Sequence, residues 1–385
     1  MTDRIRIAMI GCGGITKPRI EGFRQNWDKG LKRFELVAVC DLDESRAQQR
    51  AQETAAFQGT TPRVYTDYRK LLDAEKLDAV DVQTEHRSHH TIVCESFERG
   101  HHVIVAKPLG LTMRSCKVMV EAAKKAGKIL AVAENYRREP GQRAINWALR
   151  QGMIGEPRLL VWNDIYERLQ PWAWRDFREQ AGGGWCLDGG VHFTDLFRYN
   201  LGEADTLYAV SRQFEPYRYG KPELRGEPVK VTVEDAVTAV ITFKSGAAVQ
   251  WTFSCMTRGR ELRDRFISGS QGCLDWKLGL LRKGKQTPLG ELVRQMMSSL
   301  DAEAKERLFP CGMTHTFATE IKDFGDALLS GTKFEVDGLE GLKDQAISMA
   351  LYESSHLSQP VKLAQVESCE VEGWQKDLNQ AVGLA

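Results

Sequence analysis

The sequence lacks the features that mark membrane-spanning, secreted or nucleic-acid-binding proteins. Its 385 residues contain no apolar run that approaches the length of a membrane span, and the chain enters an apolar strand pattern without a signal-peptide core. The 53 basic and 52 acidic residues leave a net charge of +1, and the basic residues are dispersed along the chain. We therefore expect no binding to nucleic acid or to a membrane surface. No internal repeat or low-complexity segment stands out.

Cysteine is present, but not in the patterns of disulfide-bonded or metal-binding proteins. There are 9 cysteines, an odd number, and no C-x-x-C pair. This pattern is typical of reduced thiols, so we expect a cytoplasmic enzyme. Cys186 lies inside a motif of polar residues, where we interpret it as a small buried hydrophobe. The length of the chain predicts about two domains with sizeable cores.

The N-terminal segment RIRIAMIGCGGIT, residues 4–16, has the pattern of a dinucleotide-binding turn. A short apolar strand ends in Gly11-x-Gly13-Gly14, and a helix-like stretch follows. Gly11 permits a tight turn, and Gly13 lets the backbone approach a pyrophosphate at the helix N-terminus. Thr16 stands where a third small residue is usual, so the motif alone is a weak signal.

A second apolar strand, FELVAVC at residues 34–40, is followed by Asp41. A carboxylate at this strand end could accept hydrogen bonds from the adenosine ribose hydroxyls and would repel a 2′-phosphate. We therefore expect NAD rather than NADP. The interval from Gly11 exceeds the roughly 20 residues typical of the fingerprint, which an extended first helix and a loop around 27–33 would explain. The alternative role of Asp41 is that of a turn residue at a strand end.

Strands and helices alternate through the first half of the chain, as in a doubly wound parallel sheet. We expect further strands at 78–84, 101–107 and 128–133. We expect one helix that begins after Asp41 and ends at 56, and others at 67–74, 88–99 and 112–126. Ligands on such sheets collect at the carboxyl ends of the strands. The residues predicted at those ends are Thr84, Glu85, Lys107, Pro108, Glu134 and Asn135.

From residue 134 the pattern changes, so we expect a dinucleotide-binding domain over 1–133 and a second α/β domain over 134–385. The second domain is expected to contain longer strands that bury one face, such as AAVQWTF at 247–253. Its other expected features are a helix at 141–150, a strand at 158–165, a polar loop at 215–228 and a helical excursion at 288–308.

The segment GGGWCLDGGVHFTD, residues 182–195, carries polar groups at a spacing that chemistry can use. Asp188, His192 and Asp195 lie at i, i+4 and i+7, which places them on one face of a helix. We expect the helix to begin at or just after Gly190, with Asp188 near the N-cap and His192 in the first turn. There the helix dipole favours a neutral ring that accepts a proton, as a general base must. The alternative is a capping aspartate and a core histidine.

Three segments resemble the Gfo/Idh/MocA family, the relatives of glucose-fructose oxidoreductase and inositol dehydrogenase. They are AKPLGLT at 106–112, the glycine-rich segment at 182–195 and EDAVTAVITFKSGAAVQWTFS at 234–254. The resemblance implies an N-terminal Rossmann domain and a C-terminal α/β domain with an open, mostly antiparallel sheet. In the family that sheet often packs against another subunit, so we expect a homo-oligomer, dimer or tetramer. The resemblance also implies a sugar or cyclitol substrate, with Lys107, Asp188 and His192 at the catalytic positions.

The resemblance implies NAD as cofactor and a set of residues to bind it. That set is Gly11, Gly13, Gly14, Ile15, Asp41, Thr84, His86, His89, Lys107, Pro108 and Asn135. Two positions depart from the family pattern, because Ala106 replaces the usual glutamate and Thr84-Glu85-His86 replaces T-P-N. Affinity for the cofactor and its retention could therefore differ from the norm. The histidines at 86, 89, 90, 101 and 102 lack a convincing carboxylate or thiol partner, so no metal site is predicted.

Oxidation of a hydroxyl removes a hydride from carbon and a proton from oxygen, and the residues can be assigned on that basis. His192 is expected to be the base, and Lys107 to donate a hydrogen bond or proton to the same oxygen. Asp188 could orient either group or hold a second hydroxyl. The other candidate substrate contacts are Trp172, Trp174, Arg175, Trp185 and His315. The tryptophans suit the apolar faces of a pyranose, but tryptophans also fill cores.

Three functions remain open from the sequence. The first is a dehydrogenase or reductase of a sugar, inositol or glycoside. The second is a glycosidase that recycles NAD, by oxidation at C3, elimination of the glycosidic bond, addition of water and re-reduction. The third is a non-catalytic NAD-sensing regulator, which the retention of Lys107, Asp188 and His192 disfavours. Most of the family works by net oxidoreduction, so we favour the first function.

Overall fold

The computed structural model describes residues 4–220 and 227–384, and the chain divides into two compact units. The first unit takes residues up to Gly110, Ser115–Glu139 and Leu300–Gly341, and the second takes Leu111–Arg114, Pro140–Ser299 and residues from Leu342 onward. The units therefore do not follow the expected sequential division at residue 134, because residues 300–341 return to the first unit. No helix in the described part of the chain is long and apolar enough to span a membrane.

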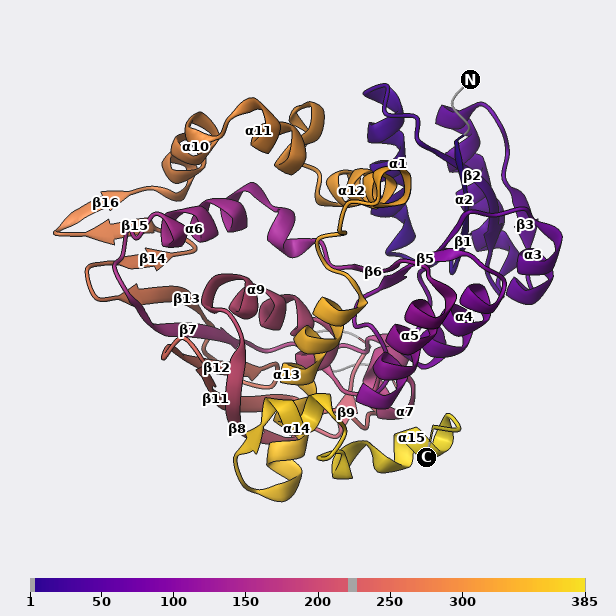
Figure 1. Ribbon diagram of the computed structural model, residues 1–385. Coiled ribbons are helices and arrows are strands. Elements are labelled where there is room, and N and C mark those ends of the chain that lie inside the picture. The colour runs from indigo at the N-terminus through magenta and orange to yellow at the C-terminus, as the bar shows by residue number, and fades with distance from the viewer. Residues whose placement is uncertain (1–3, 221–226, 385) are drawn as a thin grey trace. The chain divides into compact units, whose positions relative to one another are not determined.

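The first unit contains a parallel sheet of six strands in the order β3-β2-β1-β4-β5-β6 (Figure 1). Its strands are β1 Ile5–Ile10, β2 Phe34–Cys40, β3 Arg63–Tyr65, β4 Ala79–Val82, β5 His102–Ala106 and β6 Leu130–Ala133. Every residue of β4 and β6 is buried, as expected for strands covered by helices on both faces. The order is that of a doubly wound Rossmann sheet, which confirms the predicted fold of this unit. The sequence analysis missed only the short strand β3.

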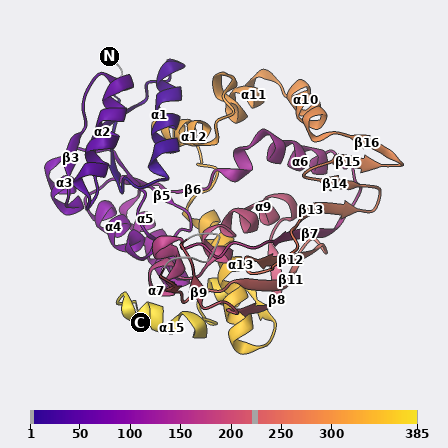
Figure 2. The ribbon, with the colours of Figure 1, turned by 180° about the vertical axis from the view of Figure 1, so that it is seen from behind.

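Helices α1 to α5 follow strands of the first unit close to the positions expected, and the first unit also contains α11 and α12 from much later in the sequence. They are α1 Thr16–Asp28, α2 Glu44–Gln58, α3 Tyr68–Ala74, α4 His86–Glu98, α5 Met113–Ala126, α11 Ala302–Leu308 and α12 Thr316–Ser330. Helix α12 lies beside α1, far from it in sequence (Figure 2). Gly22 makes this close approach possible, since a Cβ there would lie 3.0 Å from the Ala318 nitrogen. Asn26 then donates a hydrogen bond to the Ala318 carbonyl at 2.8 Å.

The second unit contains a sheet of nine strands in the order β16-β15-β14-β13-β7-β12-β11-β8-β17. Neighbouring strands are antiparallel except for the parallel pair of β7 and β12. The long strands are β7 Pro157–Ile165, β8 Ala204–Arg212, β11 Ala236–Phe243, β12 Ala248–Ser254 and β13 Leu262–Gly269. The short ones are β14 Cys273–Asp275, β15 Gly279–Arg282, β16 Lys285–Thr287 and β17 Val361–Lys362. The predicted fold class, α/β with a mostly antiparallel second sheet, is confirmed.

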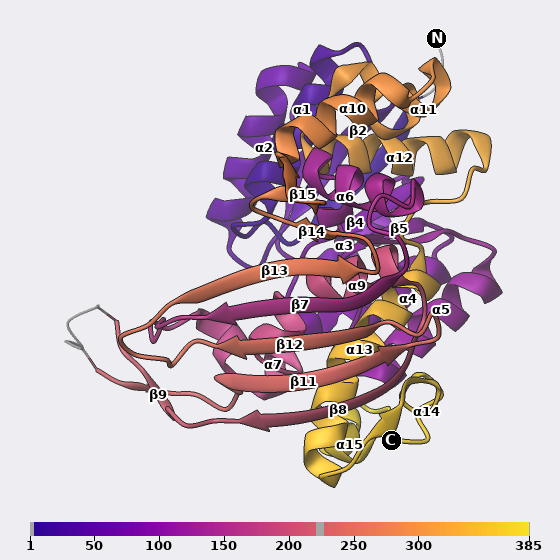
Figure 3. The same ribbon diagram turned by 90° about the vertical axis from the view of Figure 1, so that its left-hand side faces the viewer.

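Helices cover one face of this sheet and leave the other open. Figure 3 shows the five long strands with α9 and α13 behind them. On the covered face, Trp162 and Trp251 are fully buried against Phe193 and Phe197 of α9. Side chains on the opposite face alternate outward along β8 and β11, as period-2 strands require.

The helices of the second unit complete the element list. They are α6 Pro140–Arg150, α7 Arg178–Ala181, α8 Trp185–Asp188, α9 Val191–Leu201, α10 Leu289–Ser299, α13 Gly338–Leu357, α14 Leu363–Glu367 and α15 Lys376–Ala381. The predicted excursion at 288–308 is confirmed as α10 and α11. The predicted loop at 215–228 contains the short strand β9 Tyr217–Arg218 and precedes β10 Val229–Lys230, while residues 221–226 lie outside the described residues.

Candidate functional site

The turn after β1 has the shape that a dinucleotide requires. Gly11 has a φ of 92°, and a Cβ there would lie 2.4 Å from the Gln83 carbonyl oxygen, so only glycine fits. At Gly13 and Gly14, by contrast, a Cβ would meet nothing within 4 Å. Open space beside these two glycines leaves the backbone accessible to a pyrophosphate group.

Helix α1 starts directly at this turn. Ile15 is its N-cap, and its side chain makes no capping hydrogen bond to the first N–H groups of the helix. Thr16 is buried, and its hydroxyl donates a hydrogen bond to the Gly13 carbonyl at 2.6 Å. That bond explains how a threonine replaces the third small residue of the usual motif.

Asp41 follows the last residue of β2 and is held firmly. Its Oδ2 accepts a hydrogen bond from the Cys12 nitrogen at 2.7 Å, and its Oδ1 accepts one from the Asp43 nitrogen at 2.9 Å. A carboxylate offers about four lone-pair sites, so two remain for ribose hydroxyls. The long interval from Gly11 consists of α1 and the loop at 29–33, as expected.

His89 joins two loops at the carboxyl ends of neighbouring strands. Its side chain is fully buried on α4, with Nδ1 3.2 Å from the carbonyl oxygens of both Pro108 and Leu109 and Nε2 3.2 Å from that of Thr84. Burial lowers the pKa of His89 to about 3 despite these acceptors, so the ring is neutral. The neutral ring donates one hydrogen bond and connects two segments that carry residues expected to bind the cofactor, Thr84 and Pro108.

The other residues predicted near the cofactor occupy the same strand ends. Lys107 is half-buried directly after β5 and precedes a cis bond to Pro108. His86 begins α4, with its ring 5.8 Å from that of His89. Asn135 follows β6 closely and donates a hydrogen bond to the Thr316 hydroxyl at 2.7 Å. Its amide nitrogen therefore has a structural partner that the sequence did not predict.

The five histidines near β5 do not gather at one point. His101 and His102 lie at the start of that strand, where His101 Nδ1 faces the Leu77 carbonyl and His102 Nδ1 accepts a hydrogen bond from the Ile129 nitrogen. His89 lies beyond the other end of β5, where backbone carbonyl oxygens contact both nitrogens of its ring. Among the described residues, no group of three or more His, Cys, Asp or Glu side chains could hold a metal ion.

The glycine-rich segment of the second unit forms two consecutive helices. Helix α9 begins at Val191, which confirms the expected start, but its N-cap is Gly190. Asp188 lies two residues before this N-cap, near it as expected, but it also ends the separate helix α8, where its nitrogen donates to the Gly184 carbonyl at 2.9 Å. Gly189 and Gly190 keep right-handed helical torsion angles. The i, i+4 relation of Asp188 and His192 is therefore preserved through the junction.

Asp188 and His192 are both buried in the second unit, with exposed fractions of 4% and 8%. Arg175 donates a hydrogen bond from Nε to Asp188 Oδ1 at 3.2 Å. The guanidinium thereby fixes the carboxyl group and supplies a positive charge beside it. Asp195, the third polar residue of the motif, is fully buried on α9.

Aromatic side chains lie around Arg175, the hydrogen-bond partner of Asp188. The Trp185 ring lies between Trp172, at a centroid distance of 5.1 Å, and Phe253, at 6.1 Å. The Arg175 guanidinium lies 4.3 Å from the centroid of Trp174 and 5.3 Å from that of Trp172. All three tryptophans are partly exposed, so they form a surface beside Asp188 rather than a closed core.

Two further candidates have structural roles. His315 is the N-cap of α12 in the first unit, where its Nδ1 accepts a hydrogen bond from the Ala318 nitrogen at 3.3 Å. Cys186 is fully buried, and burial raises the pKa of its thiol well above the usual value, which confirms its interpretation as a small hydrophobe. The sequence analysis did not single out Glu234, whose carboxylate contacts the backbone of the glycine-rich segment.

Comparison with known proteins agrees with the geometry of both units. Residues 5–134 match the oxidoreductase family with an NAD-binding Rossmann fold, and residues 142–275 match the GFO/IDH/MocA C-terminal domain. The chain is 28% identical to D-apiose dehydrogenase of Paraburkholderia graminis over 95% of this chain and 91% of that protein. It is 26% identical to 1,5-anhydro-D-fructose reductase of Ensifer adhaerens over 77% of this chain and 83% of that protein.

A solved structure also shares the fold. The WlbA dehydrogenase from Bordetella pertussis, in complex with NADH and UDP-GlcNAcA, has a TM-score of 0.74 at 23% identity, covering 94% of this chain and 99% of that one. The two family matches are consecutive and together cover most of the sequence. The chain thus belongs to the Gfo/Idh/MocA family and is an NAD-dependent oxidoreductase with a Rossmann domain and the family's C-terminal domain.

Proposed function

We propose that the protein is a dehydrogenase that exchanges a hydride between NAD and a hydroxyl-bearing carbon of a sugar, glycoside or cyclitol. The observation that carries the proposal is the buried pair of Asp188 and His192 on consecutive helical turns, with Arg175 bonded to Asp188. The relatives and the solved structure named above act on, or are bound to, carbohydrates of three different kinds. They support the substrate class and leave the individual sugar to experiment.

The cofactor we propose is NAD rather than NADP. Gly11, Gly13 and Gly14 would hold its pyrophosphate, and Asp41 would accept hydrogen bonds from the adenosine ribose. A fixed carboxylate disfavours a 2′-phosphate, because both groups are negative. When bound, NAD supplies the acceptor for the hydride.

Residues of this chain are proposed to accept the proton and to stabilise the charge on the reacting oxygen. His192 is proposed to accept the proton of the reacting hydroxyl as a general base. The ammonium group of Lys107 is proposed to stabilise the negative charge that develops on that oxygen. Asp188, held by Arg175, is proposed to orient the base or a second hydroxyl.

The aromatic surface supports a carbohydrate substrate. Trp172, Trp174 and Trp185 present ring faces that suit the apolar C–H faces of a pyranose, and Arg175 supplies hydrogen-bond donors at their edge. His315 remains a candidate for substrate binding through its Nε2, since Nδ1 is used by the helix cap.

We also propose that the protein forms a homo-oligomer through the open face of the nine-stranded sheet. Tyr208 and Val240 lie directly opposite each other on β8 and β11, with exposed fractions of 44% and 51%. Val210 and Leu159 add exposed apolar area on the same sheet. A second copy of this chain would remove these side chains from water.

The proposed reaction is tested by measuring whether NADH accumulates as the sugar is oxidised. The enzyme is incubated in deuterium oxide with NAD and a panel of free sugars, cyclitols and aryl glycosides, while NADH and sugar mass are followed together. We expect one NADH per sugar oxidised and no deuterium at C2. Deuterium at C2 with repeated release of the aglycone per NAD would establish the recycling glycosidase instead, and NAD binding without turnover of any substrate would favour the regulator.

A further inference from the structure

A buried carboxylate outside the predicted site holds the backbone of the glycine-rich segment. Glu234 lies two residues before β11, and its side chain is buried. Its Oε2 accepts a hydrogen bond from the Gly184 nitrogen at 2.7 Å, and its Oε1 accepts one from the Cys186 nitrogen at 3.0 Å. Both donors lie at the start of α8, the helix that ends in Asp188.

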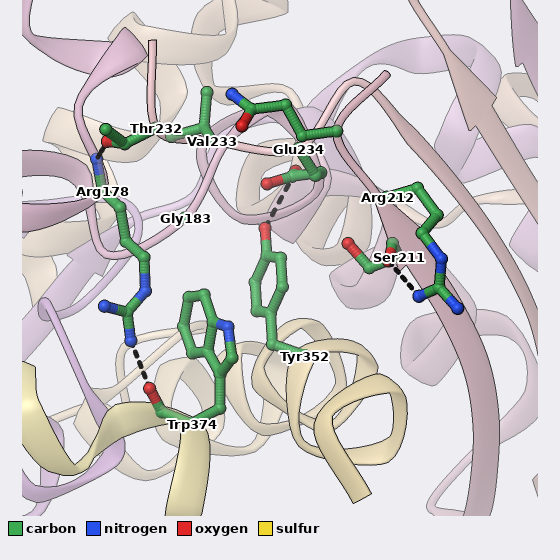
Figure 4. Close-up of a pocket in the computed structure, with 10 residues that line it drawn as sticks. Arg178, Gly183, Ser211, Arg212, Thr232, Val233, Glu234, Tyr352 and Trp374 are labelled. Carbon is green, nitrogen blue, oxygen red and sulfur yellow. Dashed lines mark hydrogen bonds between the residues drawn. The ribbon is translucent and has the colours of Figure 1, made fainter. Parts of the chain in front are cut away.

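A second element secures this carboxylate. Tyr352 of α13 donates a hydrogen bond from its hydroxyl to Glu234 Oε1 at 2.9 Å (Figure 4). The Tyr352 ring stacks on Trp374 at a centroid distance of 4.3 Å, and the Arg178 guanidinium covers the other side of that indole at 4.0 Å. Arg178 also donates to the Trp374 carbonyl. Glu234 thus accepts hydrogen bonds from the start of α8 and from the C-terminal part of the chain.

The fit between Glu234 and the glycine-rich segment leaves no room for side chains. A Cβ at Gly184 would lie 2.6 Å from Glu234 Oε2, and a Cβ at Gly183 would lie 2.5 Å from the Tyr352 hydroxyl. These glycines are therefore required for close approach of the backbone rather than for flexibility. The carboxylate fixes the direction of two N–H groups at the start of α8.

Burial of Glu234 carries a cost that simple packing would not require. Burial raises the pKa of Glu234 above its usual value, although the Cys186 and Gly184 N–H groups and the Tyr352 hydroxyl oppose this change. An apolar side chain of similar size would fill the same volume without that desolvation. The carboxyl group accepts three hydrogen bonds in return, two of them from the backbone that leads to Asp188.

The backbone hydrogen bonds of the segment connect this anchor to the catalytic candidates. The Asp188 nitrogen donates to the Gly184 carbonyl at 2.9 Å, and the nitrogens of Gly189 and Gly190 donate to the Trp185 carbonyl at 2.9 and 2.7 Å. The His192 nitrogen then donates to the Gly189 carbonyl at 3.3 Å. A shift at Gly184 would therefore move Asp188 and the start of α9.

We propose that Glu234, supported by Tyr352, is a positioning residue that sets the Asp188 carboxyl and the His192 ring through the backbone of residues 184–190. This inference rests on the proposed dehydrogenase function and adds two residues to it. Misplacement of a reacting group by about 1 Å can cost on the order of a hundredfold in rate. Neither Glu234 nor Tyr352 is required to touch the substrate.

The informative substitutions change hydrogen bonds without changing volume. Glu234→Gln leaves one oxygen acceptor and turns an N–H pair toward a backbone donor, and Tyr352→Phe removes only the hydroxyl. Glu234→Ala is less suitable, because it would enlarge a cavity of about 150 Å³ that Glu234, Tyr352 and Trp374 already line. Glu291→Gln is the matched control, since Glu291 makes an exposed ion pair with Arg294 on α10.

We expect Glu234→Gln and Tyr352→Phe each to lower kcat by at least about tenfold, while KM for NAD changes less than about twofold. Glu291→Gln should leave both constants unchanged. A lowered melting temperature with normal kcat would show a role in stability alone and would overturn the proposal. If Glu234→Gln fails to fold, Tyr352→Phe carries the test, because it retains the carboxylate.

A double-mutant cycle separates positioning from independent effects. If Glu234 acts partly through Asp188, Glu234→Gln should lower kcat by a smaller factor in the Asp188→Asn background than in the wild type, whereas fully multiplicative losses would contradict the proposal. A crystal structure of Glu234→Gln provides a readout without activity. It should show the Asp188 carboxyl displaced and its bond to Arg175 lengthened, and an unchanged segment would overturn the inference even if the wild type proved not to be a dehydrogenase.

Discussion

Arg19 on α1 donates a hydrogen bond from Nη1 to Oε2 of Glu320 on α12 at 2.6 Å, across 301 positions of the sequence. Nε of the same guanidinium donates to Asp81 of β4, and all three side chains are buried. Two carboxylates therefore share one guanidinium in the interior of the first unit. The cluster explains how residues 300–341 are fastened to a sheet built from the other end of the chain.

This cluster predicts a pH dependence of stability. Burial raises the pKa of Glu320 from 4.5 to about 7, against the attraction of Arg19. Because the folded state holds the proton more tightly than the unfolded state, the contribution of Glu320 is greatest below about pH 4.5 and is lost as the pH rises through about 7. A shift of this size corresponds to about 3 kcal/mol.

The measurement is urea unfolding of the wild type and of Glu320→Gln at intervals between about pH 4.5 and 8. The free energy of unfolding of the wild type should fall with rising pH by about 3 kcal/mol more than that of the variant. Glu335→Gln is the control, since Glu335 is a partly exposed partner of Arg138 in the same unit. Parallel curves for wild type and Glu320→Gln would contradict the assignment.

Asp41 should determine the choice of cofactor. Isothermal titration is expected to show tighter binding of NAD than of NADP to the wild type. Hydrogen bonds to a charged group are worth about 1.5–3 kcal/mol, so Asp41→Ala should weaken NAD binding by roughly 10- to 100-fold. The difference in affinity between NAD and NADP should therefore become smaller. Asp43→Ala is a matched control, because Asp43 caps α2. Equal or tighter binding of NADP by the wild type would refute the assignment.

Much of the first unit could be predicted because its signals are local. Buried strands such as β6 are short apolar runs, and glycine is the residue that fits the turn at position 11, where a Cβ would collide with the Gln83 carbonyl. The start of α9 was predicted for a similar reason, since the cost of glycine inside a helix places its start after Gly190.

The features that could not be predicted depend on contacts distant in sequence. No local pattern shows that α12 packs against α1, or that the carboxylate beneath Gly184 comes from residue 234. The short helix α8, which ends in Asp188, was not predicted, because four residues followed by two glycines give no periodic signal. The run of three glycines at 182–184 was the local hint of close packing, since a Cβ at Gly183 or Gly184 would meet Tyr352 or Glu234.

The open sheet face predicts a change in assembly on substitution. Val240→Lys would place a charge opposite Tyr208 in the middle of the exposed apolar surface. We expect light scattering to show the wild type as a dimer or tetramer and Val240→Lys as a smaller species, because burial of an unpaired ammonium is costly. Leu357→Lys, a similar change at the exposed end of α13, should leave the assembly unchanged. A monomeric wild type would contradict the prediction.

The assignment of Lys107 and His192 is tested by removing each side chain. His192→Ala removes the proposed base and Lys107→Ala the proposed cation beside the reacting oxygen, so each should lower kcat by at least about a hundredfold. Binding of NAD, measured by titration, should remain nearly intact, because the turn at Gly11 and the carboxylate of Asp41 are untouched.

Controls for this test come from exposed positions of the same residue types. Lys285→Ala on β16 and His356→Ala near the end of α13 should retain normal kcat, since both side chains are exposed. Loss of activity in the controls would indicate a general effect of substitution. Near-normal kcat in His192→Ala would show that another residue accepts the proton, and near-normal kcat in Lys107→Ala would show that Lys107 does not stabilise the charge on the reacting oxygen.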